Sequence, residues 1–305
     1  MESGDSGRIH RAHLKHSSFL TAIGPYRRFL LPTKRNFASL QRRFFTLCPP
    51  IKTMPDIEWN LSIWNDRYKW PQDGEEWSRG WGSAQAQFMG SILPRIAPWL
   101  PAASILEIGP GFGRWTQFLL KFCQSYAGVD LSQKCVAACK EKFAAQSHAH
   151  FFANDGMSLD CIANGSIDFV FSYDSLVHAE IEVMASYIPQ LIRKLKPEGA
   201  VFIHHSNGAK AGVPAQHNHS RSVSVSSNIV KEIIETNGGH TLVQEEIDWI
   251  LPQLIDCHTT FCRKTASFAG TPPLLLSNNE FMKEATMIRE KQNPYWNATR
   301  QARAS

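Results

Sequence analysis

Three glycines stand at alternate positions in the segment EIGPGFGRW, directly behind an apolar run. Glycines spaced this closely let the backbone approach a cofactor. A phosphate-binding loop needs Lys and Ser or Thr after its last glycine, where this chain has Arg114 and Trp115. A dinucleotide fingerprint needs GxGxxG, whereas Gly109, Gly111 and Gly113 are spaced GxGxG. The sequence therefore disfavours both kinds of phosphate-bearing cofactor.

Glu107 stands two positions before the first of these glycines. Its negative charge would repel a pyrophosphate but suits a ligand that carries an ammonium group. S-adenosyl-L-methionine has that ammonium group and a sulfonium, and it has no phosphate. The charge at this position therefore favours S-adenosyl-L-methionine as the cofactor.

Histidines near the ends of two later apolar runs are candidates for a general base. A methyl group on sulfonium is already activated, but a hydroxyl acceptor benefits from a base by roughly 10²–10⁴-fold. His178 follows one run, and His204 and His205 end the next. Side chains alternate along a strand, so at most one of the latter two faces the acceptor. The alternative role for each is core packing or a hydrogen bond to the backbone.

Asp174 adds a carboxylate to this group of candidate catalytic residues. Together with His178 and a histidine of the later run it could hold a divalent metal that orients a diol. Histidines beside a cleft more often form hydrogen bonds than bind metals, so no metal is expected.

Short apolar runs alternate with longer amphipathic segments, which predicts βαβ units, a parallel sheet and an α/β fold. The expected strands are Ser104–Ile108, Tyr126–Val129, Phe151–Ala153, Ile167–Ser172 and Ala200–His204. The expected helices are Arg114–Cys123, one capped by Ser132 that runs to Ala145, Ile181–Leu195 ended by a turn at Pro197–Gly199, and Ser227–Asn237.

The last two predicted strands, Thr241–Trp249 and Leu254–Arg263, are joined only by Ile250–Gln253. So short a connection cannot form a crossover, and these strands should be antiparallel neighbours. We therefore expect five parallel strands closed by an antiparallel pair, with helices on both faces.

With these features, residues from Trp59 to Arg263 resemble the class I S-adenosylmethionine-dependent methyltransferases, which have a Rossmann-like fold. Glu107–Gly113 matches the first motif of that family. The resemblance assigns Asp130, followed by Leu131, to the ribose hydroxyls, and Asp155 to the adenine amino group. It also places four further residues at the cofactor: Gly156, Met157, Ser172 and Tyr173.

Four segments are similar to a bacterial-type subgroup with small-molecule or sugar-like acceptors: WNDRYKW, EWSRGWG, YDSLVHAE and FIHHSN. The resemblance implies methylation of a hydroxyl on a small molecule. The first two segments are rich in aromatic residues, which predicts a helical cap that completes the core and covers the sulfonium. We expect Tyr68, Trp81 and Gln85 of this cap to face the cofactor.

The first 53 residues carry a net charge of +8, while the formal charge of the whole chain is +5. We expect this head to be a basic, disordered extension. Two alternatives remain: translation starts at Met54, or the head is an organelle-targeting peptide. The remaining chain is slightly acidic, so we expect no nucleic-acid partner. An RNA or protein methyltransferase that uses the head as its arm, and a non-catalytic cofactor-binding module, are the rival interpretations.

Seven cysteines without a CxxC pair suggest free thiols and a cytoplasmic location. No apolar run approaches the length of about 18 residues needed to span a membrane.

The predicted domains are the extension 1–53, the cap 54–102, the methyltransferase core 103–265 and a tail 266–305. The tail is expected to be helical over Asn279–Lys291 and to cover the pocket or a second subunit, which leaves a homodimer open. Asn293-Pro294-Tyr295 resembles a motif of amine methyltransferases, but it stands in the tail rather than after the fourth strand, so we interpret it as chance.

Overall fold

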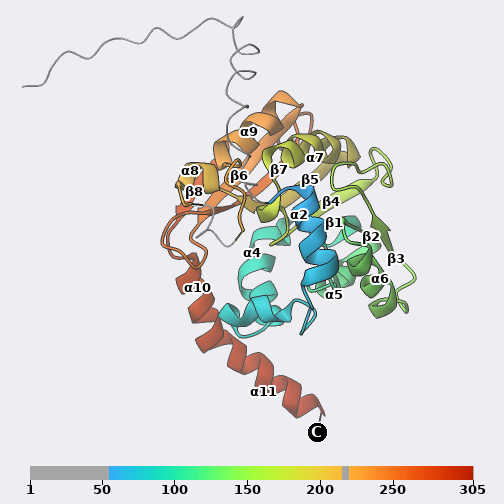
Figure 1. The fold of residues 1–305 in the computed structure, drawn as a ribbon, viewed down its shortest axis with the longest axis vertical. Coiled ribbons are helices and arrows are strands. Elements are labelled where there is room, and N and C mark those ends of the chain that lie inside the picture. Colours follow the sequence, from blue (N-terminus) through green and yellow to red (C-terminus); the bar gives the residue numbers. More distant parts are fainter. Residues whose placement is uncertain (1–54, 215–219, 305) are drawn as a thin grey trace, which may run out of the picture. The chain divides into compact units, whose positions relative to one another are not determined.

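The computed structural model describes residues 55–214 and 220–304, which form an α/β fold around one sheet (Figure 1). The eight strands lie in the order β3-β2-β1-β4-β5-β7-β6-β8. Their bounds are β1 Ala102–Ile108, β2 Cys123–Asp130, β3 Ala149–Ala153, β4 Ile167–Ser172, β5 Leu195–Ser206, β6 Gly239–Ile247, β7 Asp256–Arg263 and β8 Leu274–Asn278.

The first five strands are parallel, and β7 runs antiparallel between β5 and β6. The predicted five parallel strands and antiparallel closing pair are therefore confirmed. The strand order reverses between β1 and β4, and such a reversal opens a crevice at the carboxyl ends of the strands.

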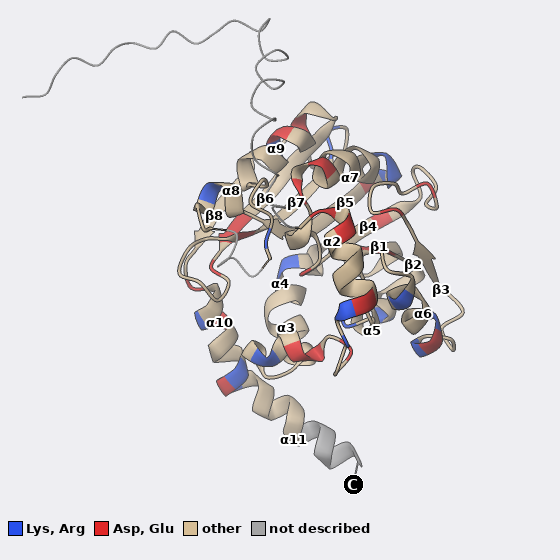
Figure 2. Ribbon diagram, in the orientation of Figure 1, with Lys and Arg blue, Asp and Glu red and all other residues tan. Residues whose placement is uncertain are grey.

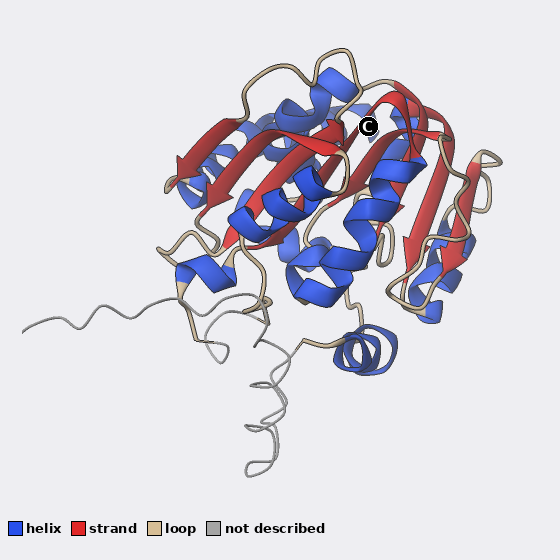
Figure 3. Cartoon of the chain, turned by 90° about the horizontal axis from the view of Figure 1, so that it is seen from above, coloured by secondary structure: helices blue, strands red, loops and turns tan. Residues whose placement is uncertain are grey.

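Helices cover both faces of the sheet (Figure 3). Regular α-helices of the cap, residues 54–102, are α2 Ile57–Leu61, α3 Ala84–Gln87 and α4 Leu93–Ile96, with π-helical turns at Ser62–Arg67 and Phe88–Ile92 and 3₁₀ turns at Glu75–Trp81 and Ala97–Trp99. Further along the chain are α5 Thr116–Leu119, a 3₁₀ turn at Leu120–Phe122, α6 Gln133–Lys142, a 3₁₀ turn at Leu176–His178, α7 Ile181–Lys194, α8 Gly208–Ala211 and α9 Ser227–Thr236. The tail forms α10 Phe281–Met287, a π-helical turn at Ile288–Gln292 and α11 Asn293–Ala304.

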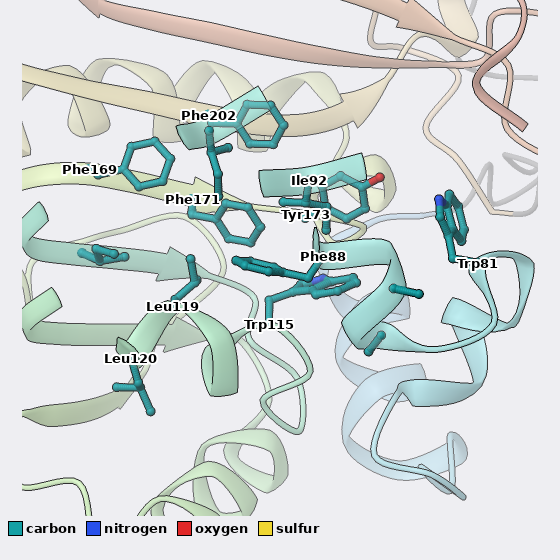
Figure 4. Packing of buried hydrophobic residues seen from close by; sticks show 14 of the residues in the cluster. Trp81, Phe88, Ile92, Trp115, Leu119, Leu120, Phe169, Phe171, Tyr173 and Phe202 are labelled. Carbon is teal, nitrogen blue, oxygen red and sulfur yellow. The ribbon is translucent and has the colours of Figure 1, made fainter. Parts of the chain in front are cut away.

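Two apolar clusters hold these layers together. One joins the cap helices and α5 to one face of the sheet, where Phe88, Trp115 and Phe171 pack as shown in Figure 4. The other joins α7 and α9 to the opposite face. The cap therefore completes the core, as its aromatic content predicts.

Local signals explain several helix starts. The hydroxyl of Ser132 accepts a hydrogen bond from the amide of Cys135, 3.2 Å away, and so caps α6 as expected. Asp56 caps α2 in the same way, through the amide of Trp59 at 2.7 Å. The helix expected over Arg114–Cys123 is shorter, because the glycine loop extends to Trp115 and Cys123 already belongs to β2.

The turn expected at Pro197–Gly199 is not a break between elements. Strand β5 starts at Leu195, and its pairing with β4 moves from Ile167–Leu195 to Phe169–Ala200. Three extra residues of β5 are thereby accommodated as a bulge inside the strand.

Strand β8 was not expected from the sequence and corrects the predicted strand count. It pairs in parallel with β6, and Leu274, Leu275 and Leu276 are all exposed. A short strand without alternating polarity gives no period-2 signal, which is why the pattern does not reveal it. The helix expected over Asn279–Lys291 is present as α10 and the following π-helical turn.

The tail packs against the cap. Phe281 lies 5.8 Å from Trp81, between ring centroids, and the hydroxyl of Ser83 donates to Asn293 Oδ1 at 3.1 Å. Asn293 therefore has a structural contact with the cap. Arg95 of α4 adds an ionic link, because it pairs with Glu245 of β6 at 2.6 Å and with Glu284 of α10 at 2.9 Å.

Replacing Arg95 with Met should lower the free energy of unfolding by about 2–4 kcal/mol, because two largely buried carboxylates lose their partner. Urea denaturation at pH 7 measures this loss. The control is Lys231→Met, which breaks an exposed i,i+4 pair with Glu235 and should cost less than about 0.5 kcal/mol. Equal losses in the two variants would show that Arg95 does not fasten the cap.

Candidate active site

A pocket lies at the carboxyl ends of β1, β2 and β4, where the strand order reverses. Eight residues predicted for the site line it: Gly109, Gly111, Asp130, Leu131, Gly156, Tyr173, Asp174 and His178. The cap contributes the other wall, through Ile57, Asn60, Trp64, Trp70 and Trp77. The pocket is therefore enclosed between the sheet edge and the cap.

The glycine loop after β1 needs its glycines for two reasons. Gly109 and Gly111 have φ values of 70° and 57°, a region that other residues rarely adopt. A Cβ on Gly109 would also stand 1.9 Å from the hydroxyl oxygen of Ser175, and one on Gly111 would stand 2.8 Å from the ring of Trp70. The loop backbone thus passes too close to its neighbours for any side chain, and it presents bare peptide groups to the pocket.

Asp130 ends β2 with its carboxylate bound to the glycine loop. Its two oxygens accept hydrogen bonds from the amides of Gly111, at 3.0 Å, and Ser132, at 2.8 Å. Burial raises the pKa of Asp130 to about 6, although these two hydrogen bonds favour the ionised form. Each oxygen can accept a further hydrogen bond, so the carboxylate can also bind hydroxyl groups of a ligand in the pocket.

Glu107 does not line the pocket. It is buried under the loop, where its Oε2 accepts hydrogen bonds from Tyr126, at 2.5 Å, and Thr116, at 2.8 Å. Burial raises its pKa to about 7. The sequence suggests that Glu107 attracts a ligand's ammonium group directly. In the structure it is instead held inside the protein by two hydroxyl groups, one from β2 and one from α5.

Asp155, Met157 and Ser172 also lie outside the pocket lining. Asp155 is exposed, and its Oδ1 accepts hydrogen bonds from the amides of Met157 and Ser158 in its own turn. These hydrogen bonds lower the pKa of Asp155. Ser172 is buried and donates to the carbonyl of Ile108 at 2.9 Å. Gly156 alone from the segment after β3 reaches the pocket, among the residues that the structure describes.

The cap residues chosen from the sequence are not those that line the pocket. Trp81 is buried in the core, and its indole donates to Ser91 at 2.8 Å. Tyr68 donates to Glu76, and Gln85 is half-buried on α3. Neighbouring tryptophans take the expected place instead, since Trp64 and Trp70 line the pocket. Irregular π and 3₁₀ turns hide this from a count of helical periods.

His178 is buried at the pocket wall, within a single 3₁₀ turn after β4. Its Nδ1 lies 2.8 Å from the carbonyl oxygen of Ser220, which can only accept, so Nδ1 carries the proton. Burial, reinforced by the positive charge of Arg221, lowers the pKa of His178 to about 4. The imidazole is therefore neutral at pH 7, with an unprotonated Nε2.

His204 and His205 point to opposite faces of β5, as alternation predicts, and neither lines the pocket. His205 donates from Nδ1 to the carbonyl of Ser206 and accepts at Nε2 from Thr259, at 2.8 and 2.7 Å. With both nitrogens engaged, it has the hydrogen-bonding role that was the alternative. His204 accepts at Nδ1 from the amide of Asp174, at 3.2 Å, and supports the pocket from behind.

Asp174 lines the pocket as half of a buried ionic network. Its carboxylate lies 2.8 Å from Arg114 and 3.6 Å from Arg221. Arg221 also contacts Asp256 at 3.0 Å. Although burial opposes ionisation, the two arginines hold the pKa of Asp174 below its usual value. An ion-paired carboxylate of this kind is a poor proton acceptor.

In residues 55–214 and 220–304, no group of three His, Cys, Asp or Glu side chains is arranged to hold a metal ion. Over the same residues, no helix is both long and apolar enough to cross a bilayer.

Comparison with known proteins agrees with this geometry. Residues 105–199 match a family model described as "Methyltransferase domain". No curated protein sequence matches the chain.

Several solved structures are similar to this chain. They include N-methyltransferase NodS from Bradyrhizobium japonicum WM9 in complex with S-adenosyl-L-homocysteine (16% identity, 68% of this chain and 96% of that one, TM-score 0.48). A TehB-like SAM-dependent methyltransferase from Corynebacterium glutamicum has 18% identity over 59% and 88% of the two chains, with a TM-score of 0.43. An S-adenosylmethionine-dependent methyltransferase from Clostridium acetobutylicum has 13% identity over 61% and 92%, with a TM-score of 0.48.

The glycine loop and the acid that ends β2 both lie within residues 105–199, which match the methyltransferase domain. The chain therefore contains a methyltransferase domain.

Replacing Asp130 with Ala should weaken binding of S-adenosyl-L-homocysteine at least about 30-fold, because the ligand loses charge-assisted hydrogen bonds. Calorimetric titration gives both dissociation constants. Asp155→Ala is the informative comparison, since this exposed carboxylate is engaged in its own turn and should change the affinity less than about threefold. A large loss in Asp155→Ala would mean that the turn rearranges around the ligand.

Proposed function

We propose that this enzyme transfers a methyl group to a hydroxyl of a small molecule, with His178 as the general base. The observation that carries the proposal is the hydrogen bond from His178 Nδ1 to Ser220, which leaves Nε2 unprotonated at the pocket wall. A hydroxyl acceptor must lose its proton during transfer, and this nitrogen can receive it.

The lowered pKa of His178 fits this role at neutral pH. Desolvation keeps the ring neutral, so nearly every molecule has the base in its active form. The same lowered pKa makes His178 a weak base. A weak base is enough to take the proton of the acceptor when the methyl donor is strongly electrophilic. Bound S-adenosyl-L-methionine supplies that electrophilic methyl group on its sulfonium.

The residues present fit this cofactor. We assign the ribose hydroxyls to Asp130, whose oxygens can accept further hydrogen bonds. We assign the methionine part of the cofactor to the glycine loop, which has no side chains in the way. Ile57, Leu131 and Gly156 give the pocket lining an apolar surface, to which we assign the adenine ring. The indoles of Trp64 and Trp70 supply ring faces for the sulfonium.

The rival acceptors are RNA and protein, with the basic head as the binding arm. That head lies outside the described residues. In the described part, Lys and Arg lie on several elements, among them α4, α6, α8 and α10, with Asp and Glu between them (Figure 2). A small-molecule acceptor agrees better with this mixed surface.

We also propose the domain bounds 1–53, 54–102, 103–265 and 266–305, a homodimer, and a cytoplasmic location. The last rests on cysteines that are free throughout the described residues.

His178→Ala should lower kcat by about 10²–10⁴-fold and leave the affinity for S-adenosyl-L-homocysteine near normal. In the parent enzyme, the acid limb of kcat/KM should fall near pH 4, because His178 protonates only there. Steady-state rates from pH 3.5 to 8 provide the measurement. His240→Gln, on β6 and bonded to Thr271, is the control and should leave both parameters unchanged. Normal turnover by His178→Ala would remove this residue as the base.

The acceptor class is tested with methyl-labelled S-adenosyl-L-methionine and pools of small metabolites, RNA and protein. Label should enter the metabolite pool, and equally so after removal of residues 1–53. Label that enters only RNA or protein, and is lost with the head, would overturn the proposed acceptor.

A further inference from the structure

Asn60 is a cap residue whose amide reaches the turn that carries His178. It lies on α2 and lines the cofactor pocket. Its Nδ2 donates to the carbonyl oxygen of His178 at 2.8 Å, although the two residues are 118 positions apart in the sequence. This hydrogen bond joins the cap directly to the residue that we propose as the base.

The amide of Asn60 can take only one orientation. Its Oδ1 lies 3.0 Å from the indole nitrogen of Trp64, which can only donate. Its Nδ2 faces the carbonyl oxygens of Pro55, at 3.2 Å, and Asp56, at 3.0 Å, as well as that of His178, and all three can only accept. A flipped amide would lose every one of these hydrogen bonds. The partners of Asn60 therefore fix both ends of its side chain.

Trp64 extends this contact to the imidazole of His178. The ring centroids of Trp64 and His178 are 5.4 Å apart, and those of Trp59 and His178 are 6.5 Å apart. Both indoles belong to the cap, and Asn60 binds the indole nitrogen of Trp64. One asparagine thus holds the backbone of the His178 turn and also a ring that covers the imidazole.

The segment before α9 holds the same turn from another direction. The carbonyl of Ser220 accepts from His178 Nδ1, and the amide of Ser222 donates to the carbonyl of Val177 at 2.9 Å. The turn itself is a single 3₁₀ turn, Leu176–His178, and so short a turn has few hydrogen bonds of its own. Its position therefore depends on these partners from outside.

The burial of His178 follows from this arrangement. The residue is only 9% exposed, and desolvation is the main cause that lowers its pKa to about 4. Three charged groups act on the ring as well: Arg221 lowers its pKa, whereas Asp174 and Asp256 raise it. These charges lie on segments other than the cap, so a change at Asn60 alters the cover over the ring rather than its charged neighbours.

We propose that Asn60 is a positioning residue for the base: it fastens the cap to the His178 turn and so keeps the imidazole covered, with its proton on Nδ1. The role of His178 as base belongs to the proposed function, on which this inference rests. The addition is that the cap, and not only the edge of the sheet, determines the state of the base.

The test observes His178 directly, by NMR of the full chain labelled with ¹⁵N in histidine and saturated with S-adenosyl-L-homocysteine. The His178 resonances are assigned by their absence from His178→Gln. In the parent, His178 should stay neutral and protonated on Nδ1 from pH 7.5 to pH 5, because its pKa lies near 4. In Asn60→Ala, water reaches the ring, so the midpoint of its titration should rise by at least about 1 pH unit and the second tautomer should appear.

Asn65 provides the matched control, because it fastens the same cap at another point of the fold. Its Oδ1 accepts from the hydroxyl of Ser132 at 3.1 Å and from the amide of Lys134 at 3.2 Å. Asn65→Ala should lower the Tm but leave the tautomer and the titration of His178 as in the parent. Asn60→Leu, which roughly keeps the side-chain volume, is the second variant and should behave like Asn60→Ala.

The rate provides an independent measurement. With methyl-labelled S-adenosyl-L-methionine, transfer into the metabolite pool should fall at least about tenfold in Asn60→Ala, because the base is displaced. The Kd for S-adenosyl-L-homocysteine should stay within about threefold of the parent value.

Two results would overturn the role of Asn60. One is a set of His178 resonances in Asn60→Ala and Asn60→Leu that match those of the parent. The other is failure of both variants to fold, which would make Asn60 a support of the fold alone. Normal turnover by His178→Ala would instead refute the proposed base, and it would leave the NMR result at Asn60 unaffected, since no methyl transfer takes place in that experiment.

Discussion

The carboxylate of Asp174 is buried between two arginines, and the active site depends on this arrangement. Arg114 belongs to the glycine loop and Arg221 to the segment before α9, while Asp256, which starts β7, completes the network. Two positive and two negative charges are balanced, as buried charges must be. Any displacement of one element would leave an unpaired charge in the interior, so the glycine loop, the end of β4 and the start of β7 are fixed relative to one another.

This network also explains the unusual backbone at the site. Asp174 has a φ of 59°, which is strained for a residue other than glycine. Its amide donates to His204, whose Nε2 faces Asp256 at 3.2 Å. His204 is thus a positioning residue that holds the turn after β4 from the back. This turn places Tyr173 and His178 on the pocket wall, between the sheet and the cap.

The order of elements could be predicted from the sequence because apolar runs, caps and loop lengths are local signals. The direction of individual side chains could not, because it depends on partners that are distant along the chain or compete locally. Glu107 is turned inward by Tyr126 of the neighbouring strand, and Asp155 is engaged by amides of its own turn. Whether Trp81 or Trp70 lines the pocket depends on where π-helical turns rotate the cap residues. Helix propensities of single residues do not specify such turns.

Charge balance also agrees with the reactants that we propose. At one end of the pocket, Asp130 accepts hydrogen bonds from the glycine loop and retains capacity for hydroxyl donors, which we assign to the ribose of the cofactor. At the other end the arginines and carboxylates neutralise each other, and desolvation keeps His178 uncharged. A charged acceptor would find no free counter-charge there and would have to give up its hydration. In the reaction that we propose, an uncharged hydroxyl gives up little hydration, and the neutral imidazole of His178 would take its proton. The burial that lowers the pKa of His178 therefore agrees with an uncharged acceptor.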